Sequence, residues 1–380
     1  MKLKPAFAYK LRQVIIITFL WVIINAFVEL NNAVNYDPDT GKHFLYFIFG
    51  RNVLEHLLIT AIGPLCGGLL GGTFIIFYQR EKLKGKTYGW KLLIHSLIYI
   101  VFVSFCILMV GIVAALLNQD DASFWKNFSR DIFSLRGLRL LVIWYIIVIM
   151  TIFLVDVSEK YGAGVLKKLL LGKYHSPGNE DRIFMFLDLT SSTTIAEKIG
   201  DEKYFQMLRY FYQVADEAII NNYGEIYQYI GDEIVISWER TEGLKNANCL
   251  SCFFAIRENV RKQAEIFLEK YAVVPDFKAA LHSGIVTTGE IGLIKKDIVY
   301  SGDVLNTTSR MVALCNQYNA MLIISGVLYD ELKNIPGFQF TYLESPELRG
   351  KTVKLDLYSV EAAEDVLEGH QVSERVNNIA

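Results

Sequence analysis

The chain has 380 residues, of which 52% are hydrophobic and 21% are charged, and its formal net charge at pH 7 is -2. A length of this order allows two or three domains. The nearly balanced charge gives no electrostatic reason to expect a nucleic-acid partner. Five scattered cysteines form no disulfide framework, which fits a reducing cytosol for the soluble part.

The N-terminal part contains four long apolar segments, at residues 14–30, 57–78, 92–117 and 140–155. A bilayer needs roughly 20 apolar residues per helix, and each segment is near that length. The first segment is not expected to be a cleaved signal peptide, because no small-residue cleavage site follows it. Residues 1–155 are therefore predicted to be an all-α membrane domain with four transmembrane helices.

Basic residues predict the orientation of this domain, because short cytoplasmic loops are enriched in Lys and Arg. The first loop, residues 31–43, is acidic and polar and is expected outside. The N-terminus and the second loop are expected inside, since they carry Lys2, Lys4, Lys10, Arg12, Arg80, Lys82, Lys84, Lys86 and Lys91. Four spans return the chain to the cytoplasm at Asp156, which predicts a multi-pass protein of the inner or plasma membrane with its C-terminal half in the cytosol.

The second apolar segment carries glycines at the spacing of small-xxx-small helix packing. Such a contact can lie within one subunit or between two, and the positions are Gly63, Gly67, Gly68, Gly71 and Gly72. Residues 156–180 are predicted to be a connector with a short amphipathic helix at 165–171 that ends at Gly172. The connector is either a passive linker or a coupling element.

From Arg182 onward the pattern changes to alternating strands and helices. A strand at 182–189 precedes a helix at 193–222 that breaks at Gly200-Asp201, and strands at 225–230 and 233–238 form a hairpin around Gly231-Asp232. A long helix at 242–271 and strands at 277–285, 288–293 and 298–300 follow, then a helix at 304–318 and a strand at 321–324. The opening order β-α-β-β-α-β predicts a ferredoxin-like α+β domain, and residues 362–380 are predicted to be a polar tail.

Two carboxylates are predicted to meet in this domain, although they are far apart in sequence. The first and third strands lie side by side in this topology, which brings Asp188 close to Asp232. Two adjacent carboxylates repel each other unless cations neutralise them. Two Mg²⁺ ions are the usual solution in phosphoryl chemistry, and the Leu189 carbonyl is a further candidate ligand. The alternative is that Asp188 caps a helix and Asp232 only forms a turn.

Three segments of this domain resemble the signature segments of class III nucleotidyl cyclases. They are Phe186-Leu-Asp-Leu-Thr-Ser-Ser-Thr193, Ile230-Gly-Asp-Glu233 and Gly302-Asp-Val-Leu-Asn-Thr-Thr-Ser-Arg-Met311. The resemblance covers about residues 181–360, so residues 181–361 are expected to be the catalytic domain. It implies a head-to-tail homodimer that forms a cyclic nucleotide and pyrophosphate from a nucleoside triphosphate, with active sites at the subunit interface.

The resemblance also implies a role for individual residues. Asp188 and Asp232 would hold two Mg²⁺ ions, with Mn²⁺ possible. From the partner subunit, Asn306 would orient the ribose and Arg310 would stabilise charge on the α-phosphate. Either Arg349 or Lys351, in the segment Leu348-Arg-Gly-Lys351, would hold the outer phosphates. Positioning and electrostatics suffice for this reaction, so no protein nucleophile is required.

The two positions that read the base depart from the adenylyl cyclase pattern. Gln228 stands where a Lys is usual, and Val299 stands where an Asp or Thr is usual. A Gln amide can both donate and accept, so it suits adenine or cytosine in one orientation and guanine or uracil in the other. ATP is the first choice because it prevails in the family, and GTP or a pyrimidine triphosphate stays open.

Three other functions are weighed against this one. A diguanylate cyclase would need a Gly-Gly-Asp/Glu-Glu-Phe hairpin, whereas this hairpin reads Ile230-Gly-Asp-Glu-Ile234. A non-catalytic nucleotide-binding membrane receptor would be expected to lack a metal Asp, the Asn or the Arg, and this chain has all of them. A small transporter is disfavoured because the spans show no paired charges and no internal repeat.

Overall fold

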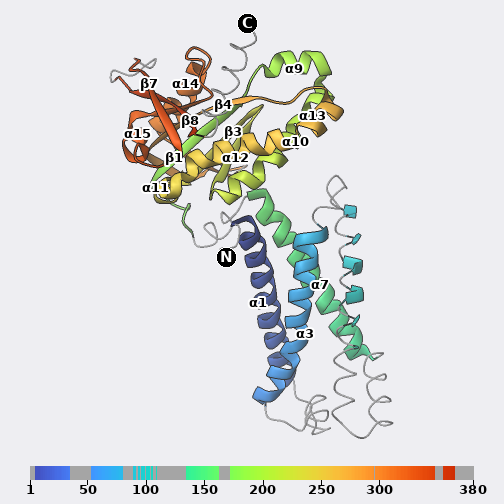
Figure 1. The fold of residues 1–380 in the computed structure, drawn as a ribbon. Helices are drawn as coiled ribbons and strands as arrows, with labels where there is room; N and C mark the ends of the chain where they lie inside the picture. The colour runs from blue at the N-terminus through green and yellow to red at the C-terminus, as the bar shows by residue number, and fades with distance from the viewer. Residues whose placement is uncertain are drawn as a thin grey trace. The chain divides into compact units, whose positions relative to one another are not determined.

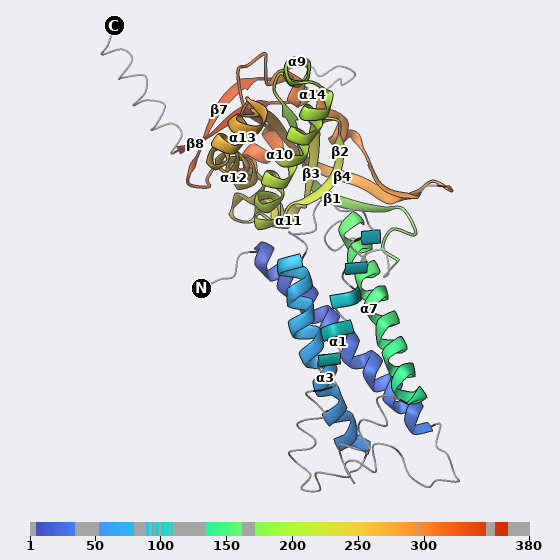
Figure 2. The same ribbon diagram turned by 90° about the vertical axis from the view of Figure 1, so that its right-hand side faces the viewer.

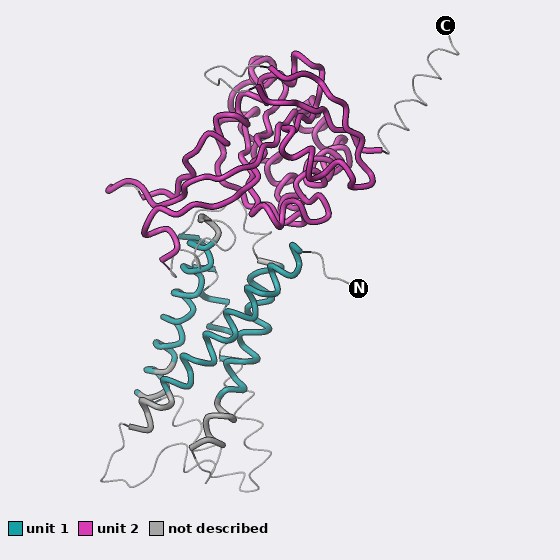
Figure 3. Tube along the Cα trace, turned by 90° about the vertical axis from the view of Figure 1, so that its left-hand side faces the viewer, with its two compact units in different colours: residues 1–160 teal, residues 161–380 magenta. Residues whose placement is uncertain are grey.

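The structure is a computed structural model that describes residues 5–34, 53–79, scattered residues of 89–108, and residues 134–161, 172–294, 296–346 and 354–363. The chain divides into two compact units, Met1–Lys160 and Tyr161–Ala380 (Figure 3). The predicted connector helix at 165–171, Arg349, Lys351 and the predicted tail beyond residue 363 lie outside the described residues. The predicted domain boundaries stay predictions.

Unit 1 is built from long helices (Figure 1). Its described elements are α1 (Pro5–Val34), α3 (Val53–Thr73), the π-helix η1 (Phe74–Gln79) that continues α3, and α7 (Leu135–Tyr161). Helices α1 and α7 contain apolar stretches long enough to cross a membrane, Pro5–Val28 and Leu141–Ser158. The described residues therefore hold two such helices, whereas the sequence predicts four.

Among the described residues, neither the second nor the third predicted span forms an apolar helix long enough to cross a membrane. The apolar part of the second is Ala61–Phe77, which is shorter than the stretches in α1 and α7. The third, at 92–117, lies mostly outside the described residues.

The helices of unit 1 meet around Trp21 of α1. Its indole Nε1 donates a hydrogen bond of 3.0 Å to the Thr151 hydroxyl of α7, and its ring lies 5.6 Å from that of Trp144. A Cβ added at Gly68 of α3 would lie 2.6 Å from the Thr18 Cα of α1, so only glycine allows this approach. In this structure the predicted small-residue contact therefore packs α3 on α1 within one chain.

Unit 2 is a mixed sheet in the order β2-β3-β1-β4-β6-β8-β7, with β5 paired to β4. β4 and β6 are parallel, and the other described strand pairs are antiparallel. The predicted pairing of the first and third strands is confirmed, because β1 lies between β3 and β4. The strands are β1 (Gly178–Leu189), β2 (Glu225–Ile230), β3 (Glu233–Glu239), β4 (Phe277–Ile291), β5 (Asp297–Ser301), β6 (Leu322–Ser325), β7 (Phe338–Glu344) and β8 (Leu357–Ala362).

Helices cover both faces of this sheet (Figure 2). Odd-numbered residues of β1, such as Ile183 and Met185, belong to a core shared with α10, α12 and α13. Phe184 and Phe186 belong to a second core shared with α14 on the opposite face. The helices are α9 (Ser192–Ile199), α10 (Asp201–Asn221), α11 (Arg240–Leu244), the 3-10 helix η2 (Lys245–Ala247), α12 (Asn248–Lys262), α13 (Ala264–Tyr271), α14 (Asp303–Leu314) and α15 (Gly326–Leu332).

Two element predictions are wrong. The single helix expected at 242–271 is broken, because Asn246 and Ala247 adopt positive φ angles of 52° and 50° and the Asn248 side chain donates to the Glu242 carbonyl over 2.7 Å. The two strands expected at 277–293 are one strand, β4, because β1 pairs with it from Phe277 to Thr288 and β5 continues from Thr287 to Ile291. The predicted helix break at Gly200 is confirmed, with φ 83° there.

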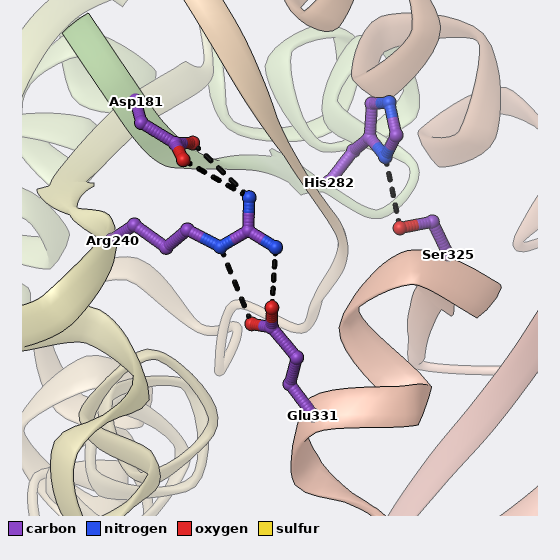
Figure 4. A network of polar contacts seen from close by, with 5 residues as sticks. All are labelled: Asp181, Arg240, His282, Ser325 and Glu331. Atoms are coloured by element: carbon purple, nitrogen blue, oxygen red, sulfur yellow. Dashed lines mark hydrogen bonds and ion pairs between the residues drawn. The ribbon is translucent and has the colours of Figure 1, made fainter.

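Arg240 ties one end of β1 to α15 (Figure 4). Its guanidinium donates to the Asp181 carboxylate over 3.1 Å and also pairs with Glu331. Nearby, the buried His282 of β4 contacts the Ser325 hydroxyl over 2.8 Å through Nδ1. Cys249 and Cys252 are free and fully buried in the core.

The packing around Gly243 generates the first prediction. An added Cβ would lie 2.8 Å from the Ile183 Cδ1 and 2.9 Å from the Trp238 Cβ. We expect Gly243→Ala to lower the free energy of unfolding by about 1–3 kcal/mol, because overpacking outweighs the better helix propensity of alanine. Gly178→Ala is the control, since an added Cβ there meets no atom within 4 Å. Denaturant titration of both variants measures the effect, and equal stability would contradict this packing argument.

Candidate active site

Three strands bring acidic residues together at one end of the sheet. Asp188 lies at the end of β1, where its Cα is paired with Glu233 of β3 on one side and with Lys278 of β4 on the other. Asp232 occupies the turn between β2 and β3, next to Gly231, whose φ of 64° is readily adopted by glycine. The predicted proximity of Asp188 and Asp232 therefore follows from strand pairing.

The local environment opposes a negative charge on Asp188. Burial raises the pKa of this half-buried carboxyl, and repulsion from Asp232 raises it further. Lys278 opposes both effects, with its Nζ 3.6 Å from the Asp188 Oδ2. The same ammonium also donates to the Asn316 side chain over 3.1 Å, so it is shared between two partners. One lysine does not cancel the repulsion between the aspartates.

Glu233 is a third carboxylate of this cluster, and it is not among the site residues predicted from the sequence. Burial raises its pKa to about 7, with repulsion from Asp188 and Asp232 as the further causes. The strand register identifies Glu233 as a member of the cluster, because it lies directly opposite Asp188 in the antiparallel pair. The site therefore contains a third acidic group whose ionisation is opposed by burial and by the two aspartates.

Helix α10 supports the turn that carries Asp232. The Tyr212 hydroxyl donates a hydrogen bond of 2.7 Å to the Gly231 carbonyl. Burial raises the pKa of Tyr212 to about 12, and Asp232 adds to the shift. A cavity of about 750 Å³ lies beside this turn, lined by α9, α10 and the β2–β3 hairpin and including Ser192, Thr193 and Asp232. A ligand beside the carboxylates has room there.

Asn306 and Arg310 lie one turn apart on α14, as predicted. Asn306 is exposed and Arg310 is half-buried, whereas Val304, Thr308 and Met311 on the same helix are buried against the sheet. In the part of the chain that the structure describes, no ion pair joins Arg310 to Asp188 or Asp232. Arg310 is therefore not paired with the aspartates of its own subunit.

The two base-reading candidates lie on strands joined by an aromatic contact. Gln228 is exposed on β2, immediately after an irregularity in the β2–β3 register between Ile226 and Gln228. Val299 is half-buried on β5, opposite Gly289. Their neighbours Tyr227 and Tyr300 have ring centroids 5.0 Å apart, so a direct contact links the residues next to positions 228 and 299.

The donor set at the end of β1 suits a hard divalent cation. Asp188 and Asp232 supply carboxylate oxygens, and a cation would relieve the repulsion that raises the pKa of Asp188. Although Glu233 interacts electrostatically with the two aspartates, within the described ranges no three His, Cys, Asp or Glu side chains form a group that could hold one metal ion. A cation with only two carboxylate ligands fits Mg²⁺, which completes its shell with water and phosphate oxygens. Leu189 follows Asp188 and has a buried side chain.

Comparisons with known proteins agree on one family. A family model described as "Adenylate and Guanylate cyclase catalytic domain" matches residues 176–362. Adenylate cyclase 2 of Rhizobium meliloti (strain 1021) is 32% identical over 311 residues, which cover 78% of this chain and 84% of the relative. The aligned 78% of this chain is longer than unit 2, so the sequence similarity extends into unit 1.

Two further matches concern the catalytic part. Adenylate cyclase 1 of the same organism is 25% identical over 180 residues, covering 46% of this chain and 27% of the relative. The solved structure of a bacterial light-regulated adenylyl cyclase has a TM-score of 0.50 and 18% identity, covering 59% of this chain and 65% of that chain. The structural likeness supports the fold of unit 2.

The raised pKa of Glu233 predicts a pH-dependent stability. An acid whose pKa rises on folding, here from 4.5 to about 7, destabilises the folded state increasingly as pH rises through this interval. In chelator-treated protein, Glu233→Gln should therefore be more stable than wild type at pH 8. The free energy of unfolding of the variant should exceed that of wild type by about 1 kcal/mol at pH 8, a figure reduced for solvent screening. This difference should be absent at pH 4.

The measurement is the thermal midpoint at both pH values. Glu197→Gln, on the exposed surface of α9, is the control and should show no such difference. A Glu233→Gln variant that is equally or less stable than wild type at pH 8 would disprove the repulsion within the carboxylate cluster.

Proposed function

The chain belongs to the adenylate and guanylate cyclase family and is an enzyme of that class, and on this premise we propose that it converts ATP to 3′,5′-cyclic AMP and pyrophosphate. The observation that supports this reaction most is the carboxylate cluster of Asp188 and Asp232 at the end of paired strands. The choice of ATP rests on the name of the relative that is 32% identical. Gln228 and Val299 are the residues proposed to contact the base.

Asp188 and Asp232 would hold two Mg²⁺ ions, with Mn²⁺ as an alternative and the Leu189 carbonyl as a further ligand. Bound divalent cations favour ionisation of the ribose 3′-hydroxyl and neutralise the triphosphate. The chain's residues then align the 3′-oxygen with the α-phosphorus, and the bond to pyrophosphate breaks as the new ester bond forms. Alignment and charge stabilisation are the contributions that such a site can supply without a protein nucleophile.

We further propose that each site is shared by two copies of this chain. Asn306 would orient the ribose and Arg310 would neutralise charge on the α-phosphate of a substrate held by the partner's aspartates. The support is that both residues lie on the side of α14 away from its buried residues, whereas the aspartates lie at the end of β1 and in the β2–β3 turn. Arg349 or Lys351 would bind the outer phosphates.

The N-terminal unit is proposed to be a four-span anchor, with residues 1–155 in the membrane domain, 156–180 as connector, 181–361 as catalytic domain and 362–380 as tail. Large apolar side chains on the outer surfaces of α1 and α7 support this, because water-exposed helices rarely carry them. Phe19 is 64% exposed and Phe27 is 71% exposed on α1, and Ile146 is 54% exposed on α7. The N-terminus and the catalytic domain would be cytoplasmic.

Product analysis tests the proposed reaction. Purified full-length protein with Mg²⁺ should form cyclic AMP from ATP faster than it forms the cyclic products of GTP, CTP or UTP. Asp188→Ala and Asp232→Ala should lower kcat at least about 100-fold while the protein still folds, because each removes a cation ligand. Near wild-type turnover in either variant would refute the metal assignment, and a faster reaction with another nucleotide would refute the choice of ATP.

Complementation tests the shared site. Asp188→Ala and Arg310→Ala chains should each be inactive alone, because each homodimer lacks one component in both sites. Coexpressed chains should regain up to about half of the wild-type activity per heterodimer, since one of two sites is then complete. Two affinity tags isolate the heterodimer for the assay. An isolated heterodimer without activity would exclude this arrangement.

Reporter fusions test the membrane topology. Fusions at Lys84 and Ala380 should report the cytoplasmic side, because the basic loops are retained there, and a fusion near Asp37 should report the opposite side. An Ala380 fusion on the outer side would exclude an even number of spans with a cytoplasmic N-terminus.

A further inference from the structure

Arg182 is a fully buried cation on β1, six residues before Asp188. Its guanidinium donates to the Glu180 carboxylate over 2.9 Å, to Glu225 at the start of β2 over 2.6 Å and to the Ser237 hydroxyl of β3 over 2.9 Å. Burial opposes its charge, but these carboxylates outweigh that cost and keep the pKa of Arg182 above its ordinary value. A buried charge of this kind persists only when its partners are in place.

The same guanidinium also supports β5 through Tyr300. The Arg182 Cζ lies 5.0 Å from the centre of the Tyr300 ring, a distance at which a cation is attracted to an aromatic face. The Tyr300 ring also contacts Phe184, at a centroid distance of 5.4 Å, and Tyr227. Tyr300 is itself buried. Displacement of Arg182 would therefore leave a space beneath this ring.

Tyr227 completes a link between the two strands. Its hydroxyl accepts a hydrogen bond of 3.3 Å from the Tyr300 backbone N–H. Tyr227 also lies at the register irregularity between Ile226 and Gln228, and a bulge of this kind changes the direction of the following side chains. Gln228 follows Tyr227 and Val299 precedes Tyr300, so both positions adjoin this link, and Arg182 contacts its Tyr300 side.

We propose that Arg182 is a positioning residue for base selection, which sets the relative placement of Gln228 on β2 and Val299 on β5 through its contacts with Glu225 and Tyr300. The inference rests on the proposed function, because it assumes that these two positions read the base. Arg182 touches no substrate in this scheme. Lysine cannot replace it, because a single ammonium lacks the planar fork that reaches Glu180, Glu225 and Ser237 together.

The test compares nucleotide discrimination in full-length Arg182→Lys, Arg182→Met and Glu225→Gln variants. The readout is the KM for ATP divided by the inhibition constant of GTP, which is measurable even where GTP is a poor substrate. We expect this ratio to change at least about fivefold, equivalent to about 1 kcal/mol. The kcat with saturating ATP should fall less than the KM rises, because a base contact present in both ground and transition states affects KM first.

Arg240 provides the matched control. It also forms ion pairs, with Asp181 and Glu331, but these tie β1 to α15 and touch neither β2 nor β5. Arg240→Lys and Arg240→Met should lower the thermal midpoint and leave the discrimination ratio within about twofold of wild type. A change of ratio in the Arg240 variants as large as in the Arg182 variants would mean a general loss of stability and would overturn the proposal.

The remaining outcomes separate this inference from the proposed function. If the wild type is active and the discrimination ratios of Arg182→Lys and Glu225→Gln stay within about twofold of the wild-type ratio, only the positioning role is overturned. A wild type that forms no cyclic nucleotide from any of the four triphosphates overturns the proposed function and this inference with it. If Arg182→Met does not fold, the Arg182→Lys and Glu225→Gln variants decide the result.

Discussion

Repulsion between carboxylates at the end of β1 is the constraint around which unit 2 is arranged. Strand pairing places Asp188 opposite Glu233 and beside the turn that holds Asp232, and burial raises the pKa of Asp188 and Glu233. Such a cluster costs stability in the absence of a cation, so the surrounding framework must hold it in place. The buried cores on both faces of β1 and the hydrogen bond from Tyr212 to Gly231 provide that framework.

Strand β1 carries Arg182 toward one end and Asp188 at the other. Arg182 is buried with carboxylate partners near one end, and Asp188 lies beside other carboxylates at the other end. Phe184 and Phe186 lie between them at alternate positions, which places all four residues on the same face of the strand. The proposed cation ligand Asp188 and the proposed positioning residue Arg182 therefore lie on one strand in the centre of the sheet.

The two units use glycine and aromatic residues for different purposes. In unit 1, Gly68 allows the close approach of α3 to Thr18, and Trp21 joins α1 to α7 through Thr151. In unit 2, aromatic contacts such as Tyr227 with Tyr300 connect strands that do not pair with each other. Apolar outer surfaces on the helices of unit 1 fit a lipid environment, whereas the apolar residues of unit 2 fill two closed cores.

Features that depend on neighbouring residues and on the order of elements were predictable from the amino-acid pattern. The Gly231-Asp232 hairpin, the helix break at Gly200 and the adjacency of Asp188 and Asp232 were all predictable, because turn chemistry and a split βαβ order are local or topological patterns. The break inside the predicted helix at 242–271 and the burial of Arg182 were not predictable in this way. Both depend on contacts between distant segments, such as Arg182 with Glu225 and Tyr300, and hydrophobic periodicity carries no information about such partners.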